Sequence, residues 1–215
     1  MPEILNELPD GFTPQNMLDL RSDKRTRMIV AVLQVAAIIF FVPLFAGFPL
    51  TFRQETGFDP ALLWDLGLSS VSGLVSVLVL AVLAFGLALV HESLHHAVLR
   101  LYGVEDITAS LNRLAPKVFA AEAYLPRLVA IIVTATPFLV VSVVGVAALL
   151  LVPDRFVAWA FLPTVIHAVI SASDFVVLAW LLGVKRNYLV TLLPGGWLAY
   201  GPGEPGDPDE TEHLV

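Results

Sequence analysis

Residues Val71 to His95 read VSGLVSVLVLAVLAFGLALVHESLH and contain the clearest structural signal in the sequence. The first twenty of these residues carry no charge, and about 20 apolar residues are what a helix needs to cross the hydrocarbon core of a bilayer. The last five, His91-Glu92-Ser93-Leu94-His95, form a His-Glu-x-x-His motif. Residues four apart share one face of a helix, so two imidazoles at this spacing can bind one Zn²⁺. Glu92 is then placed to take a proton from a water molecule beside the metal.

A polar run of this kind also has an ordinary interpretation. In a soluble helix, two histidines and a glutamate can simply belong to a solvated face. Here the run directly adjoins an apolar segment of membrane length, where polar side chains are expensive and usually functional. His96 adds a fourth polar side chain to the run. The motif and its surroundings together favour a metal site.

The composition indicates an integral membrane protein. Of the 215 residues, 57% are hydrophobic and only 14% are charged, whereas soluble domains carry about 25% charged residues. Four apolar stretches are long enough to span a bilayer, so we predict an all-α, polytopic membrane protein with about four transmembrane helices. The predicted spans are residues 28–52, 68–101, 128–152 and 156–184, in a membrane domain of residues 28–193 that lies between an N-terminal segment, 1–27, and an acidic, disordered tail, 194–215.

The distribution of basic residues predicts an orientation. Lysine and arginine crowd the segment before the first span, the loop of residues 102–127 and the end of the fourth span. Cytoplasmic loops of membrane proteins are enriched in these residues, so both termini and the 102–127 loop are expected on the cytoplasmic side of the plasma membrane. The net charge of −7 offers no basic surface for nucleic acid.

The 102–127 loop is too long for a simple turn. Its stretch Glu105–Leu111 alternates enough to pair as a short strand. Because the loop directly follows the motif helix, two roles stay open for it: a cap over the site that presents substrate, or a plain connector. Pro137 and Pro163 lie inside the third and fourth spans, and each is expected to kink its helix.

A third metal ligand must come from another span. Catalytic zinc usually has three protein ligands, and a chain without cysteine can offer only histidine or carboxylate. Asp174 is the only formal charge in the fourth span, and its predicted depth from the cytoplasmic end, roughly 13 Å, is close to that of His95, roughly 9 Å. His167 is the alternative, roughly 10 Å deeper than Asp174. His96 points about 100° away from His95 and is expected to hydrogen-bond behind the ligands.

Three segments between about residues 70 and 185 give the chain a family resemblance. They are His91–His96 at the end of an apolar helix, Glu122–Arg127 leading into a span that contains Thr136-Pro137, and Ser171–Asp174 in a later span. With these segments the chain resembles the membrane zincin peptidases, which are distantly related to the site-2 proteases.

The resemblance implies a zinc ion held by His91, His95 and Asp174, with Glu92 as general base. Site-2 proteases usually carry Leu-Asp-Gly around the distal ligand, preceded by an Asn-x-x-Pro element. Here Phe175 follows the aspartate and neither the glycine nor that element is found. What is known of site-2 protease substrates therefore does not carry over.

The function predicted from the sequence is a zinc-dependent membrane endopeptidase that cleaves a membrane-spanning or membrane-adjacent peptide. Three alternatives stay open. Buried ionisable groups also mark ion or proton pathways, and His167 favours such a binding or transport role without peptidase activity. A b-type haem could be held between His167 and one motif histidine. A zincin that serves only as a scaffold is disfavoured by the intact Glu92.

Overall fold

The computed structural model describes residues 4–203 apart from 67–72, 106, 113–114 and 121–122. Three long helices follow the predicted apolar stretches, and each is long and apolar enough to cross a membrane. Much of their hydrophobic surface faces outward, as at Phe40, Val82 and Val143. This is the arrangement expected when lipid rather than water surrounds a helix. The three helices are α1 (Lys24–Phe52), α2 (Gly73–Leu101) and α3 (Arg127–Leu151).

The fourth apolar stretch forms two helices instead of one. Helix α4 (Val157–Ile170) and helix α5 (Ala172–Gly183) are separated at Ser171 and bent by 44°, and together they are long enough for a broken span. Helix α4 continues through Pro163, and the break between the two helices comes eight residues later, at Ser171. At the break, the backbone N–H and hydroxyl of Ser171 both donate to the carbonyl oxygen of His167. Such serine bonding to the preceding turn commonly bends helices.

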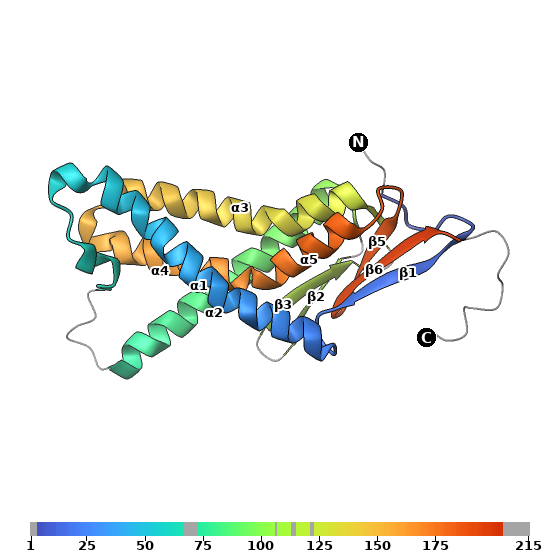
Figure 1. Ribbon diagram of the computed structural model, residues 1–215, viewed down its shortest axis with the longest axis horizontal. Helices are drawn as coiled ribbons and strands as arrows, with labels where there is room; N and C mark the ends of the chain where they lie inside the picture. The colour runs from blue at the N-terminus through green and yellow to red at the C-terminus, as the bar shows by residue number, and fades with distance from the viewer. Residues whose placement is uncertain (1–3, 67–72, 106, 113–114, 121–122, 204–215) are drawn as a thin grey trace.

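A four-stranded antiparallel sheet lies at one end of the helices, so the expectation of a strictly all-α fold is wrong (Figure 1). The predicted tail is also partly wrong, since residues 196–202 form a strand; residues 204–215 lie outside the described part of the chain. The strands, in their order across the sheet, are β1 (Phe12–Asp19), β6 (Gly196–Pro202), β5 (Leu189–Leu193) and β4 (Leu125–Pro126).

The loop after α2 contains a second, two-stranded sheet. Strand β2 (Ile107–Asn112) pairs antiparallel with β3 (Ala115–Ala120). The expectation of a short strand near Glu105–Leu111 is therefore confirmed. Short 3₁₀ helices complete the fold, at Gln54–Thr56, Pro60–Leu63 and Asp154–Phe156.

The junction between β1 and α1 is a tight turn built around Asp19. Its carboxylate accepts hydrogen bonds from the hydroxyl and backbone N–H of Ser22 and from the N–H of Arg21. These bonds, the Ser22 hydroxyl above all, lower the pKa of Asp19 to about 2. The neighbouring Leu20 donates its N–H to the carbonyl of Gly195, 2.9 Å away, in the turn between β5 and β6. The entry to α1 is thereby fastened to the sheet.

Two separate clusters of buried side chains hold the molecule together. One joins the sheet to the adjoining ends of α2, α3 and α5, and includes Leu99, Val129 and Trp197. The other lies at the far end of the bundle and includes Phe45 and Phe161 from α1 and α4. The polar motif of α2 is positioned beside the first cluster, close to where the helices meet the sheet.

Candidate metal centre

The two motif histidines share one face of α2. The Nε2 atoms of His91 and His95 lie 3.2 Å apart, and the ring centroids are 4.8 Å apart. His91 is buried and His95 is half-buried. The spacing of four residues has therefore produced two imidazoles that face one point, as the helical period requires.

Asp174 reaches the same point from α5. Its Oδ2 atom lies 3.0 Å from Nε2 of His91 and 3.6 Å from Nε2 of His95. The break at Ser171 places Asp174 in the first turn of α5, where the helix dipole favours a negative charge. The structure thus brings together the three residues predicted as metal ligands, with one ligand atom from each within 4.8 Å of the others.

The donor set of this cluster fits a cation. Nδ1 of His95 lies 2.9 Å from the carbonyl oxygen of Val133. A carbonyl oxygen only accepts, so Nδ1 carries the proton and Nε2 of the neutral ring presents a lone pair. That lone pair faces the carboxylate oxygen of Asp174, which is acceptor-only when ionised. Lone pairs that converge in this way repel one another unless a metal ion, or a proton on one of the ring nitrogens, lies between them.

The spacing of the cluster is compatible with zinc. Two ligand atoms at about 2.0–2.1 Å from a tetrahedral zinc ion lie about 3.3 Å from one another. The separations among the three ligand atoms are 3.0, 3.2 and 3.6 Å. His91, His95 and Asp174 can therefore hold a metal ion, with a fourth coordination position left over.

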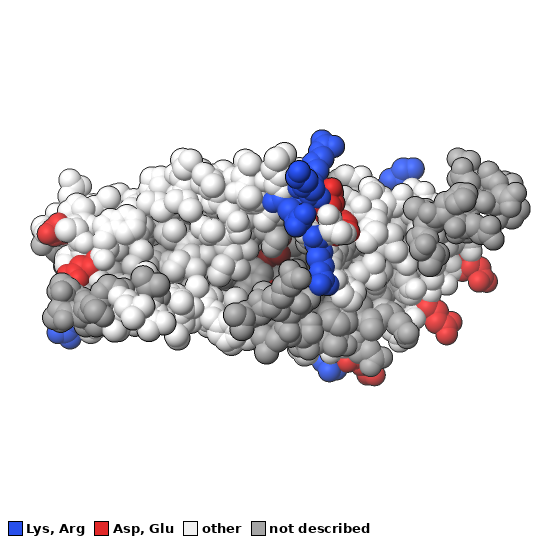
Figure 2. Space-filling view, turned by 90° about the horizontal axis from the view of Figure 1, so that it is seen from below, with Lys and Arg blue, Asp and Glu red and all other residues white. Residues whose placement is uncertain are grey.

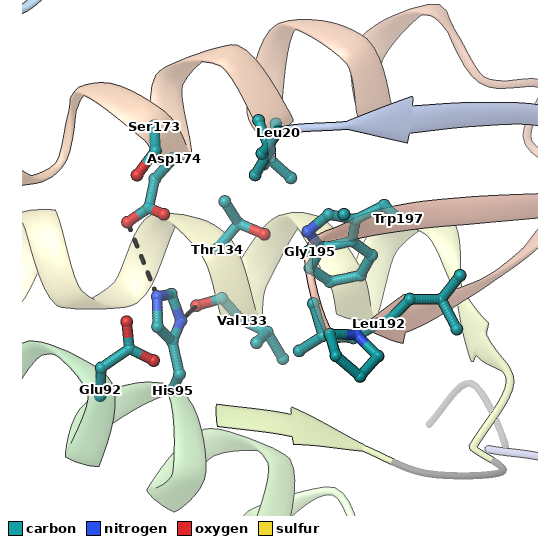
Figure 3. Close-up of a pocket in the computed structure, with 14 residues that line it drawn as sticks. Leu20, Glu92, His95, Val133, Thr134, Ser173, Asp174, Leu192, Gly195 and Trp197 are labelled. Atoms are coloured by element: carbon teal, nitrogen blue, oxygen red, sulfur yellow. Dashed lines mark hydrogen bonds and ion pairs between the residues drawn. The ribbon is translucent and has the colours of Figure 1, made fainter. Parts of the chain in front are cut away.

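Glu92 lies beside this centre without belonging to it. Its half-buried side chain lines the same pocket as His95 and Asp174, and its carboxylate lies on the α2 side of the pocket (Figure 3). A carboxylate there can exchange a proton with a molecule bound in the pocket. The structure is consistent with the predicted separation of roles between Glu92 and the two histidines.

The other wall of the pocket was not predicted from the sequence. The turn between β5 and β6, with Leu192, Gly195 and Trp197, lies across from α2, and Leu20 completes this wall (Figure 3). The sequence signals this turn only through Pro194-Gly195-Gly196, at the start of the segment predicted to be a disordered tail. Gly195 has a φ of +151°, in the region that favours glycine.

His167 and His96 occupy different positions. His167 is completely buried, and its Nε2 atom lies 3.2 Å from Nδ1 of His91. It is not one of the three clustered ligands, in line with its predicted depth, but its side chain contacts one of them. His91 lies one helical turn before His95 on α2. Its Nδ1 atom, on the side of the ring away from the other two ligands, faces His167. His96 is half-buried and is not among the described residues that line the pocket.

The fold and this cluster define a class: a mainly helical protein with three to four helices apolar enough to cross a membrane, and a His-His-Asp group able to hold a metal ion. Residues 84–189 match the model of a protein family described as “Putative zincin peptidase”. The match confirms the family resemblance predicted from the sequence, over the segment that contains both histidines and Asp174. No curated protein and no solved structure matches the chain.

Proposed function

We propose that this protein is a zinc-dependent endopeptidase that cleaves membrane-spanning or membrane-adjacent peptides. The main evidence for this proposal is that His91, His95 and Asp174 converge on one point, with Glu92 in the same pocket. The zincin family match supports zinc as the metal and peptide hydrolysis as the reaction.

The roles of the residues follow from their chemistry. A zinc ion held by the three ligands supplies Lewis acidity, which polarises a carbonyl group and lowers the pKa of water. Glu92 takes a proton from the attacking water and delivers it to the leaving nitrogen of the peptide. His95 is held in orientation by the carbonyl of Val133, so its Nε2 stays directed at the centre.

The position of the pocket supports a substrate at the cytoplasmic membrane surface. Figure 2 shows a long, almost uncharged surface over the helical half and a group of lysine and arginine side chains near its junction with the sheet. Basic residues of this kind mark the cytoplasmic boundary, so both termini and the site belong on that side. One part of the pocket is lined by the apolar side chains of Val177, Leu192 and Trp197, which suits the hydrophobic side chains of a membrane peptide in an extended conformation.

The alternative of a haem held between His91 and His167 is disfavoured by geometry. His167 and His91 approach to 3.2 Å between ring nitrogens, which leaves no room for a haem iron between them. An ion or proton pathway through the same buried residues is the second candidate, and the contact between His91 and His167 favours it. Metal content separates the two functions, because a pathway requires no stoichiometric zinc.

The test compares purified wild type with Glu92→Gln in detergent. Both proteins are incubated with a library of quenched-fluorescent peptides based on transmembrane segments, with and without a zinc chelator. Chelator-sensitive cleavage by the wild type alone supports the proposal. Equal cleavage by the two proteins, or cleavage that resists the chelator, contradicts it.

A further inference from the structure

His167 has no part in the metal cluster, yet it is completely buried on α4, directly behind His91. Its Nε2 atom lies 3.2 Å from Nδ1 of His91. Its own Nδ1 atom is buried and has no hydrogen-bond partner among the described residues. A buried polar atom without a partner is destabilising, so this histidine calls for an explanation beyond packing.

The orientation of His91 supplies that explanation. Nε2 of His91 faces the carboxylate of Asp174 and Nε2 of His95. To present a lone pair there, the neutral ring of His91 must carry its proton on Nδ1. A buried Nδ1–H requires an acceptor, and Nε2 of His167 lies at hydrogen-bonding distance from it. His167 then carries its proton on Nδ1, which is the atom left without a partner.

We propose that His167 is a positioning residue of the metal centre, accepting the Nδ1–H of His91 and so fixing the ring and its tautomer for metal binding. This inference rests on the proposed function. The carbonyl of Val133 does the same for His95. Metal-bound histidines generally need such a partner, and its loss typically weakens metal binding 10–100-fold.

The backbone of His167 is tied to the third ligand as well. Its carbonyl oxygen accepts from both the N–H and the hydroxyl of Ser171, at 2.9 and 3.0 Å. Those bonds form the break after which α5 begins, and Asp174 lies in the first turn of α5. His167 is therefore linked to two of the ligands. Its backbone carbonyl takes part in the helix break that places Asp174, and its side chain accepts the hydrogen bond that orients His91.

The test uses three replacements of His167 that differ in where they place an acceptor. In His167→Gln the side-chain carbonyl can occupy the position of Nε2. In His167→Asn the shorter side chain reaches only the position of Nδ1, and His167→Leu has no acceptor. Zinc affinity is measured for each purified protein by competition with a chromophoric chelator. Unfolding temperatures of the metal-free proteins identify any variant that fails to fold.

We expect zinc binding to weaken 10–100-fold in the Asn and Leu variants and to stay within a few-fold of wild type in the Gln variant. Thr164→Val is the matched control on α4, since the Thr164 hydroxyl donates to Ala160 and does not face the centre; its zinc affinity should equal that of wild type. Wild-type affinity in the Leu variant, or equal losses in Gln and Leu, overturns the assignment while leaving the proposed function intact. A wild type that binds no zinc overturns both.

Discussion

Glu92 shares the pocket with His95 and Asp174 but stands apart from the three clustered ligands. Glu92→Gln keeps the shape of the side chain and removes its ability to take a proton. We therefore expect unchanged zinc content and a loss of peptidase activity of about 10²–10⁴-fold. Zinc analysis and a cleavage assay on the same preparation check this. Loss of zinc together with activity would show that Glu92 is a ligand or a structural residue instead.

At the scale of single residues, the sequence contained much of the candidate site. The motif spacing placed His91 and His95 on one face, and the scarcity of charge in the fourth span pointed to Asp174. The hydrogen bond between Nδ1 of His95 and the carbonyl oxygen of Val133 could not be predicted. Every residue has a backbone carbonyl, so the sequence does not indicate which one accepts this bond. The sequence predicts that His167 lies outside the ligand cluster, but its contact with His91 depends on how α4 packs against α2, which no local sequence pattern specifies.

At the scale of elements, α3 and α4 pack closely at Gly145. A Cβ atom at that position would overlap the side chain of Thr164 on α4. We expect Gly145→Ala to lower the free energy of unfolding by about 1–3 kcal/mol, the usual cost of overpacking. Gly86→Ala is the matched control, because a Cβ atom there meets nothing within 4 Å. Thermal unfolding in detergent measures both variants, and equal unfolding temperatures would contradict the close packing of α3 on α4.

Helices were easier to predict than strands for a physical reason. A run of about 20 uncharged residues is a strong local signal, and α1, α2 and α3 follow such runs. The sheet depends on pairing between segments far apart in the chain: β1 begins at Phe12 and its partner β6 begins at Gly196. Short strands of mixed polarity carry little local information about such partners.

At the scale of the whole molecule, the proposed orientation places both termini and the 102–127 loop in the cytoplasm. Single cysteines at Ser22, Asp65 and Lys117 report the orientation without background, because the chain has no cysteine of its own. A membrane-impermeant thiol reagent added to intact cells should label only the cysteine at Asp65. Labelling of the Lys117 variant from outside would show that the protein has the opposite orientation and that the site opens on the outer side of the membrane.

We propose that His91, His95 and Asp174 together hold one zinc ion. The most direct measurement is the zinc stoichiometry of purified wild type beside Asp174→Ala. Asp154→Ala is the control, because that carboxylate pairs with Arg53 away from the site. We predict one zinc per chain in the wild type and the control, and far less than one in Asp174→Ala, since two histidines alone bind zinc weakly. One zinc per chain in Asp174→Ala would contradict the account.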